Sequence, residues 1–413
     1  MSENKADTEA DISNVADRNE TVGLMEPMLV GESSKRRSEL VDLVVELVGR
    51  SAGFKRSLPP HIASSLSNLV RSMNCYYSNL IEGHDTHPID IERALKGDYS
   101  NDARKRDLQL EAQAHITVQE WIDQGGLRGR AFTTDGLRET HARFCALLPP
   151  DMLWVEDPAS GEKLPLEPGA LRKRDVIVGQ HVAVSAGALP RFLGRFEEAY
   201  GRLGTTDSII AAAAGHHRVL WIHPFLDGNG RVARLMSHAA LLEKLDTGAL
   251  WSVARGLARN VVEYKAHLAS CDQPRRNDLD GRGTLSEEAL ADFVRFFLRI
   301  CIDQVTFMEG LIQPDQLRVR VGIWAEEEIR LGKLPAKAKD VLDALLYRGE
   351  LPRADIVQIV STGDRQARRL TAALIDYGAV TSESTRAPLR LAFPATLAAR
   401  WMPGLFPDKG ADA

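Results

Sequence analysis

The chain has 413 residues, with 52 Lys and Arg against 57 Asp and Glu, a formal net charge of −5 and four cysteines. At roughly 150 residues per domain, this length predicts two to three domains and excludes a small scaffold held together by disulfides or metal ions. The weakly acidic balance excludes a chain that coats nucleic acid through basic charge along its whole length, so any such contact must be local.

The cysteines and the length of the apolar runs indicate the cellular compartment of the protein. The sequence has no CxxC pair, which indicates reduced, mostly buried thiols at Cys75, Cys145, Cys271 and Cys301. The first fifteen residues are polar and acidic, unlike a signal peptide, and no apolar run approaches the roughly 18 to 20 residues that a membrane span needs. We therefore expect a cytoplasmic protein with no membrane segment.

Helical periodicity dominates the first three quarters of the chain. Residues 1–37 hold few large apolar side chains and are expected to form a mobile tail, because they cannot offset their ordering entropy. From Ser38 to about Glu82, apolar residues recur at three- and four-residue spacing, in two runs separated by Pro59-Pro60. Further helices are predicted at about 86–97, 102–123, 132–148, 188–202, 207–222, 231–245, 257–269 and 286–312.

Only one stretch of this region is typical of strands. LRKRDVIVGQHVAV, from Leu171 to Val184, is a β-branched run interrupted by Gly179-Gln180, which favours a short hairpin. The predicted fold class is therefore mainly α, with one short β-hairpin.

A separate block begins near Leu334. Helical patterns at about 336–348, 353–360 and 363–377 precede a strand-turn-strand pattern with its turn near Ser384. This order is typical of a helix-turn-helix with a β-wing, so we predict a small C-terminal winged-helix domain.

The stretch richest in reactive side chains is HPFLDGNGRVAR, from His223 to Arg234. Its turn, Gly228-Asn229-Gly230, enters a predicted helix and presents unpaired backbone N–H groups to an anion, at the positive end of the helix dipole. Arg231 and Arg234 lie three residues apart, so both guanidinium groups can reach that anion from the first helical turn.

Two further side chains complete a reaction centre. Asp227 offers carboxylate oxygens to a hard cation that would bridge it to the same phosphates. His223 can take a proton from an incoming hydroxyl at neutral pH. A lone histidine or a lone Gly-Asn-Gly turn is more often structural, but all these groups within twelve residues predict a phosphate-transfer site.

HPFLDGNGRVAR matches, without departure, the signature of Fic-domain proteins, His-x-Phe-x-(Asp/Glu)-Gly-Asn-Gly-x-x-x-Arg, so the sequence resembles that family. The resemblance implies an all-α Fic core that transfers AMP from ATP to a Ser, Thr or Tyr hydroxyl of a protein. It makes His223 the general base, Asp227 the Mg²⁺ ligand and Arg234 the γ-phosphate ligand, and it places the anion hole for the α- and β-phosphates at Gly228, Asn229, Gly230 and Arg231. Kinase-like Doc relatives carry Lys where this chain has Gly230, which favours nucleotidyl transfer over phosphorylation.

Two other segments resemble Fic elements. Val178-Gly179-Gln180-His181 resembles the hairpin flap that covers the nucleotide and aligns the target by strand addition. Ser78-Asn-Leu-Ile-Glu82-Gly83 resembles the inhibitory motif (Ser/Thr)-x-x-x-Glu-(Gly/Asn). A carboxylate that reaches Arg234 would compete with the γ-phosphate for the same guanidinium, leaving ATP in a pose unsuited to transfer.

The resemblance leaves some activities open. In some relatives the inhibitory glutamate also positions a water that removes AMP from the protein, so de-AMPylation is a second candidate activity. Tyr264 falls where relatives contact the nucleoside with a Tyr-Tyr pair, but Lys265 follows it here. UTP, GTP or CDP-choline remain alternative donors of the transferred group, because the sequence does not identify the residues of an adenine pocket.

The C-terminal block admits two kinds of partner. Its third helical pattern would be the recognition helix, with Arg365, Arg368 and Arg369 near its start. DNA is one candidate partner, and docking of the protein target or of a second copy of the chain is the other, because winged helices serve all three purposes.

The predicted organisation is a tail (1–37), an N-terminal helical region with the inhibitory helix (38–125), a Fic core (126–312), a linker helix (313–334), a winged-helix-like domain (335–400) and a second tail (401–413). The leading functional hypothesis is an ATP- and Mg²⁺-dependent protein adenylyltransferase inhibited by Glu82, with a protein target, possible self-modification and possible homodimers. The alternative is a nucleotide-sensing winged-helix transcriptional regulator without catalysis, which the intact base His223 argues against.

Overall fold

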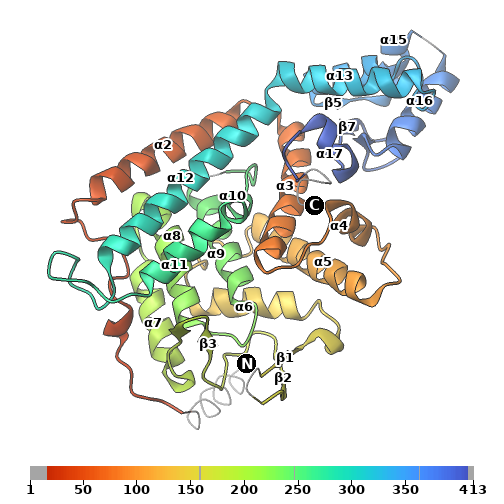
Figure 1. The fold of residues 1–413 in the computed structure, drawn as a ribbon. Helices are drawn as coiled ribbons and strands as arrows, with labels where there is room; N and C mark the ends of the chain where they lie inside the picture. The colour runs from red at the N-terminus through yellow and green to blue at the C-terminus, as the bar shows by residue number, and fades with distance from the viewer. Residues whose placement is uncertain (1–15, 158–159, 246, 362, 408–413) are drawn as a thin grey trace.

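The computed structural model describes residues 16–157, 160–245, 247–361 and 363–407 and consists mainly of helices (Figure 1). This confirms the predicted fold class. The helices that precede the C-terminal module are α2 (Arg37–Arg56), α3 (Pro60–Ile81), α4 (Pro88–Leu95), α5 (Ala103–Asp123), α6 (Thr134–Cys145), α7 (Leu189–Tyr200), α8 (Thr205–Ile222), α9 (Asn229–Leu245), α10 (Val253–Arg259), α11 (Val261–Cys271), α12 (Glu287–Ile312) and α13 (Pro314–Arg330). Short 3₁₀ turns are η1 (Val22–Met25), η2 (Pro150–Met152) and η3 (Ala186–Ala188).

Helices α8 and α9 form the centre of the molecule. They pack against each other, and α12 crosses α8 on one side while α2 packs on α12 (Figure 1). The run from Ile209 to Ala214 in α8 is completely buried, and its alanines let neighbouring helices approach closely. The loop between these two buried helices, 223–228, is therefore held at both ends by the core.

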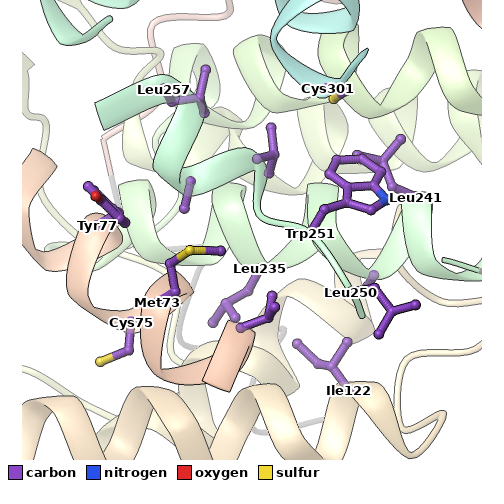
Figure 2. Close-up of a cluster of buried hydrophobic side chains, with 14 of the residues drawn as sticks. Met73, Cys75, Tyr77, Ile122, Leu235, Leu241, Leu250, Trp251, Leu257 and Cys301 are labelled. Atoms are coloured by element: carbon purple, nitrogen blue, oxygen red, sulfur yellow. The ribbon is translucent and has the colours of Figure 1, made fainter. Parts of the chain in front are cut away.

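Helix α3 packs its apolar stripe onto the same core. Figure 2 shows Met73 of α3 pointing toward Leu235 of α9, with Tyr77 one turn further along α3. Met73 is fully buried, and burial of such a side chain is worth roughly 1.5–3 kcal/mol. The C-terminal turn of α3 is thereby fixed beside the first turns of α9.

The sequence predicts one hairpin before residue 310, and the residues described there form two. The predicted hairpin is present as β3 (Ile177–Val178) and β4 (His181–Val182), paired antiparallel. The second consists of β1 (Trp154–Glu156) and β2 (Lys163–Pro165). Each of its strands has three residues, too few for an alternating pattern to be visible in the sequence.

The predicted helix over 257–269 is in fact two helices. Asn260 leaves helical geometry (φ −119°, ψ 35°), and its side chain donates a 2.9 Å hydrogen bond to the carbonyl oxygen of Gly256. An Asn side chain that competes for backbone groups favours a break of this kind. The result is a short α10 followed by α11.

The C-terminal module contains the helices and strands that the sequence predicts. A three-stranded antiparallel sheet has the order β5-β7-β6. Its assignment as a winged helix remains a prediction. The elements are α14 (Ala338–Arg348), β5 (Glu350–Leu351), α15 (Arg353–Val360), α16 (Asp364–Asp376), β6 (Val380–Thr381), β7 (Leu389–Leu391) and α17 (Ala395–Trp401).

The prediction of a mobile N-terminal tail is wrong for those of its residues that the structure describes. Met25 and Met28 are buried, and the hydroxyl of Tyr200 on α7 donates a 2.6 Å hydrogen bond to the carbonyl oxygen of Met28. Arg218 of α8 donates to the carbonyl oxygen of Pro27 at 2.7 Å. A few apolar residues suffice here because α7 and α8 offer them a complementary surface. Residues 1–15 lie outside the described part of the chain.

The second predicted tail also packs on the core as far as it is described. Trp401 is buried, with its ring centroid 5.2 Å from that of Trp324. Tyr77 of α3 donates a 2.9 Å hydrogen bond to the carbonyl oxygen of Leu405, and the ring of Phe406 lies 5.7 Å from that of Tyr76. Residues 408–413 lie outside the described part.

All four cysteines are free and buried, as the sequence predicts. Burial raises the pKa of the Cys145 and Cys271 thiols to about 12, so both remain protonated at neutral pH. Within the described residues, no helix has the length and apolar composition to cross a bilayer.

Candidate active site

The loop 223–228 owes its shape to a few residues. Pro224 cannot continue α8, so His223 ends that helix in the left-handed region at φ 52°. Asn229, the first residue of α9, accepts a 3.0 Å hydrogen bond from the N–H of Phe225 and donates a 2.8 Å bond to its carbonyl oxygen. Gly228 takes φ +78°, where a side chain would be strained. These features bring the end of α8 and the start of α9 to one place.

His223 is half-buried and neutral at physiological pH. Burial lowers its pKa to about 4, although a contact with the carbonyl oxygen of Leu220, 3.3 Å from Nδ1, opposes the shift. When Nδ1 carries the proton and donates to that carbonyl, Nε2 keeps a free lone pair. The imidazole can therefore accept a proton, as the general-base role requires.

Arg172, which no sequence motif indicates, holds the backbone of His223 in place. Its side chain is fully buried, and its Nε donates a 2.7 Å hydrogen bond to the carbonyl oxygen of His223. The same guanidinium donates to the carbonyl oxygens of Arg174 and Val184, which flank the predicted flap. Burial lowers its pKa to about 10, so it remains charged at pH 7. Arg172 thus joins the end of α8 to the base of the hairpin.

Asp227 and Arg231 form the open side of the site. The Asp227 carboxylate is 59% exposed and lies 3.9 Å from an amino group of Arg231, a loose pairing that leaves its oxygens available. Arg231 is buried, lies over the ring of Phe144, and its Nε has no hydrogen-bond partner among the described residues. A buried donor without a partner beside an open carboxylate fits the binding of a phosphate and its cation.

A buried carboxylate missing from the sequence prediction holds Arg231. Glu111 of α5 forms an ion pair with Arg231 and accepts a 2.7 Å hydrogen bond from Nδ1 of His84. That bond raises the pKa of His84. Glu111 lies 120 positions before Arg231, so no local pattern links the two. In the sequence, Glu111 is marked only as an acidic residue on the apolar side of a predicted helix.

Arg234 is held by the end of α3. Its Nε donates a 2.8 Å hydrogen bond to Oγ of Ser78, and its terminal nitrogen lies 2.5 Å from Oε1 of Glu82. Burial alone would raise the pKa of Glu82, but the guanidinium of Arg234 outweighs it, so the pKa lies below its usual value. Gly83, at φ +85°, ends α3 directly after this residue.

Gly230 provides the space for that carboxylate. A Cβ atom at this position would lie 2.4 Å from Oε1 of Glu82 and 3.2 Å from a terminal nitrogen of Arg234. The Glu82 carboxylate therefore occupies the surface of the first turn of α9, where the resemblance places the anion hole.

The hairpin β3–β4 presents an apolar edge. Ile177 is 72% exposed and Val178 43% exposed. Gly179, at φ +61°, makes the turn, and Gln180 beside it is exposed. His181 points inward instead, with Nε2 2.8 Å from the carbonyl oxygen of Trp221. The described flap residues thus divide into an exposed strand and turn and an anchoring histidine.

The nucleoside contact expected at Tyr264 has no support in the structure. Its ring is 2% exposed, and its hydroxyl lies 2.6 Å from Nε2 of His216 in the core between α8 and α11. A ring buried to this degree has no face left for a base. The hydroxyl instead holds the ring of His216, and Nδ1 of that ring lies 3.0 Å from Oγ of Ser237.

Residues 131–241, which include the hairpin and the loop 223–228, match the Fic/DOC family. Ser78, Glu82 and Glu111 precede the matched Fic segment.

The chain is also similar to curated proteins over a longer stretch. The chain is 34% identical over 222 residues to protein adenylyltransferase Fic of Drosophila erecta, covering 51% of this chain and 42% of the relative. It is 35% identical over 216 residues to the protein of the same name from Drosophila yakuba, covering 50% and 41%. The chain thus spans less than half the length of these relatives.

Solved structures show the same fold. A Fic family protein from Desulfovibrio desulfuricans superposes with a TM-score of 0.51 at 18% identity, covering 88% of this chain and 98% of that one. Fic-1 (residues 134–508) of Caenorhabditis elegans superposes with a TM-score of 0.50 at 16% identity, covering 66% and 73%. The described chain therefore has a mainly helical Fic-like fold.

Proposed function

We propose that this protein is an adenylyltransferase that transfers AMP from ATP to a Ser, Thr or Tyr hydroxyl of a protein. The observation that carries the proposal is the loop between α8 and α9. This loop and the start of α9 bring together the neutral histidine His223, the exposed carboxylate of Asp227 and two buried arginines. The Fic segment and the similarity to curated adenylyltransferases support the same reaction class.

In the proposed reaction, Nε2 of His223 takes the proton from the target hydroxyl. The hydroxyl oxygen then forms a bond to the α-phosphorus, and the bond from that phosphorus to the bridging oxygen of pyrophosphate breaks. The N–H groups at the start of α9, together with Arg231 and Arg234, stabilise the charge on the departing pyrophosphate. Mg²⁺, for which the exposed Asp227 carboxylate is a suitable ligand, would supply further charge neutralisation.

The target would be aligned by the exposed edge of the hairpin β3–β4. An extended segment can add to Val178 as a further strand, with backbone hydrogen bonds that do not depend on its sequence. The inward-pointing His181 and the buried Arg172 keep this edge at a fixed distance from His223. The chain's own segments are candidate acceptors in the same way, which would give self-modification.

Glu82 would inhibit the reaction through Arg234. Its carboxylate pairs with the guanidinium that the γ-phosphate needs, and it fills the space above Gly230. ATP would therefore bind without its triphosphate in the transfer pose. A carboxylate in this position can also orient a water for the reverse reaction, removal of AMP from the protein.

The test compares incorporation of label from α-labelled ATP with Mg²⁺ by the wild type, Glu82→Gly and His223→Ala, with a cell lysate as the source of targets. Glu82→Gly should raise the labelling rate about tenfold or more, since one charge-assisted hydrogen bond is worth roughly 1.5–3 kcal/mol. His223→Ala in the Glu82→Gly background should lower it by about a hundredfold or more.

The matched control is Asp85→Gly, which removes an exposed carboxylate three residues from Glu82 that makes no ion pair in the described chain. Its rate should equal that of the wild type. Equal labelling by all variants, His223→Ala included, would refute the transfer mechanism. ATP binding without transfer by wild type and Glu82→Gly would favour the nucleotide-sensing regulator instead.

A further inference from the structure

Helix α16 in the C-terminal module exposes a cationic face. Arg365, Arg368 and Arg369 are all exposed, as is Gln366 between them. These positions fall within the first two turns of the helix, whose buried side is formed by Ala367, Leu370 and Leu374. Spacing of one, three and four residues places the three guanidinium groups on one broad face.

These arginines have no counter-charge. Within the described chain, none of the three forms an ion pair or a side-chain hydrogen bond. Three exposed arginines elsewhere in and beside the module are paired: Arg318 lies 3.2 Å from Asp343, Arg348 lies 3.1 Å from Asp355, and Arg400 pairs with Glu327. Apart from Asp364 at its first position, the first two turns of α16 carry no acidic residue, so they keep an excess of positive charge.

The surroundings of α16 leave this face open. Figure 1 shows α15 and α16 at the outer end of the module, at the margin of the molecule away from α7 and α8. A hollow of about 340 Å³ lies along α16, lined by Arg369, Gln366 and the loop with Lys333 and Lys337. Both lysines are exposed and extend the cationic surface, although Lys333 pairs with Glu328 at 3.3 Å and Lys337 with Asp340 at 3.1 Å.

The same face lacks what a protein partner needs. Its exposed residues through the first two turns are charged or amide side chains, with no aromatic or large aliphatic anchor. Protein interfaces concentrate their binding energy in such anchors, whereas protein–DNA interfaces are polar and strongly positive. A helix of 13 residues, about 20 Å long, fits the major groove of B-DNA.

We propose that α16 binds double-stranded DNA, with Arg365, Arg368 and Arg369 on the phosphates and groove edges and Lys333 and Lys337 on the adjacent backbone. The inference goes beyond the proposed adenylyl transfer and does not depend on it. The short α15 preceding α16, separated from it by Ser361 in the left-handed region (φ 49°), would cross the DNA backbone as in a helix-turn-helix.

The test measures fluorescence anisotropy of a labelled mixed-sequence duplex of about 30 base pairs, titrated with the full chain at 50 to 200 mM salt. The wild type should bind at 50 mM salt, with an affinity that falls steeply as salt rises. The triple variant Arg365→Ala/Arg368→Ala/Arg369→Ala should bind at least about tenfold more weakly, with a salt slope smaller by roughly three, because each neutralised phosphate adds about 0.9 to the slope.

The control variant Arg318→Ala/Arg348→Ala/Arg400→Ala removes the same three charges from paired arginines and should bind within about twofold of the wild type. Thermal unfolding of each variant verifies that the module is intact. Absence of binding by the wild type at 50 mM salt, or equal weakening by the two triple variants, would overturn the proposal. Displacement of the duplex by an equal charge concentration of polyglutamate would also overturn it, in favour of an acidic protein partner. Equal affinity for single-stranded DNA would overturn the groove placement.

Discussion

At the scale of single residues, the candidate site is defined by how each ionisable group is neutralised or held. His223 is kept neutral by burial, while Arg231 and Arg234 are each held by a carboxylate from another helix, Glu111 and Glu82. The proposed base is thus neutral in the described state, whereas the arginine proposed to bind the γ-phosphate is engaged. In the proposed mechanism, access to Arg234, and not activation of His223, must therefore change before transfer occurs.

The pH dependence of transfer follows from His223. A free imidazole would lose its basic form below pH 6.5, but burial lowers the pKa of this one to about 4. The labelling rate of Glu82→Gly should therefore stay level between about pH 8 and pH 5.5, where His223 remains neutral. Initial rates in a constant-ionic-strength buffer series, with circular dichroism to verify folding at each pH, make the measurement. A half-maximal rate near pH 6.5 would contradict the buried base.

The sequence predicts several of these residues and misses others for a physical reason. The group from His223 to Arg234 is local, so its spacing carries its chemistry, and the motif at Ser78 to Glu82 leads to the observed contact with Arg234. Arg172 and Glu111 act through tertiary contacts, with a backbone carbonyl of His223 and with the guanidinium of Arg231. Contacts across such separations leave no periodicity in the sequence.

At the scale of elements, the helix that carries Glu82 is fixed by the last described segment of the chain. Tyr77, one residue before Ser78, donates to the carbonyl oxygen of Leu405 at 2.9 Å, and Tyr76 stacks edge-on against Phe406. Arg255 of α10 donates to Gly404 at 2.8 Å, closing the arrangement from the other side. The position of Glu82 therefore depends on a segment more than 300 residues away.

Loosening this segment should release inhibition. Tyr77→Phe combined with Phe406→Ala removes the hydrogen bond and the ring contact, so labelling by the otherwise wild-type chain should rise by up to about tenfold. In the Glu82→Gly background the same changes should have little effect, because no carboxylate remains to be released. Tyr347→Phe, an exposed tyrosine on α14, is the control and should leave the rate unchanged. An equal rise in both backgrounds would mean that the segment acts independently of Glu82.

Elements with strong periodicity are predicted well from the sequence, and those stabilised by distant partners are not. The apolar stripes of α3 and α12 predict the first and last residues of these helices to within about two residues. Residues 16–36 and 401–407 have too little apolar content to be recognised alone and are ordered by the surfaces of α7, α3 and α13. The hairpin β1–β2 is too short for alternation to be seen.

At the scale of the whole molecule, the core contains several buried histidine side chains that remain neutral. Burial lowers the pKa of five of them, to about 3 for His115 and His216 and to about 4 for His141, His217 and His223. Their folded forms therefore stay neutral at a pH at which the unfolded chain takes up protons. His84, whose pKa is raised, acts in the opposite direction.

Stability should consequently fall as the solution is acidified. Between pH 6.5 and about 4 the unfolded state binds more protons than the folded state, so each depressed histidine removes up to about 1.4 kcal/mol per pH unit, and the full stability is present only above pH 6.5. Differential scanning calorimetry should show a Tm that drops by several degrees between pH 7.5 and pH 5 and then continues downward. A Tm that is constant over this range would show that the histidines are accessible to protons in the folded chain.

The contact between Glu82 and the surface above Gly230 has a consequence for sequence change. A methyl group at position 230 and the carboxylate of residue 82 would occupy the same volume, since a Cβ there would lie 2.4 Å from the carboxylate oxygen. A larger residue at 230 would therefore require the Glu82 carboxylate, the end of a flexible side chain, to leave its described position. In a chain that has lost the glutamate, that contact disappears, so the two positions are sterically coupled although they lie 148 positions apart in the sequence.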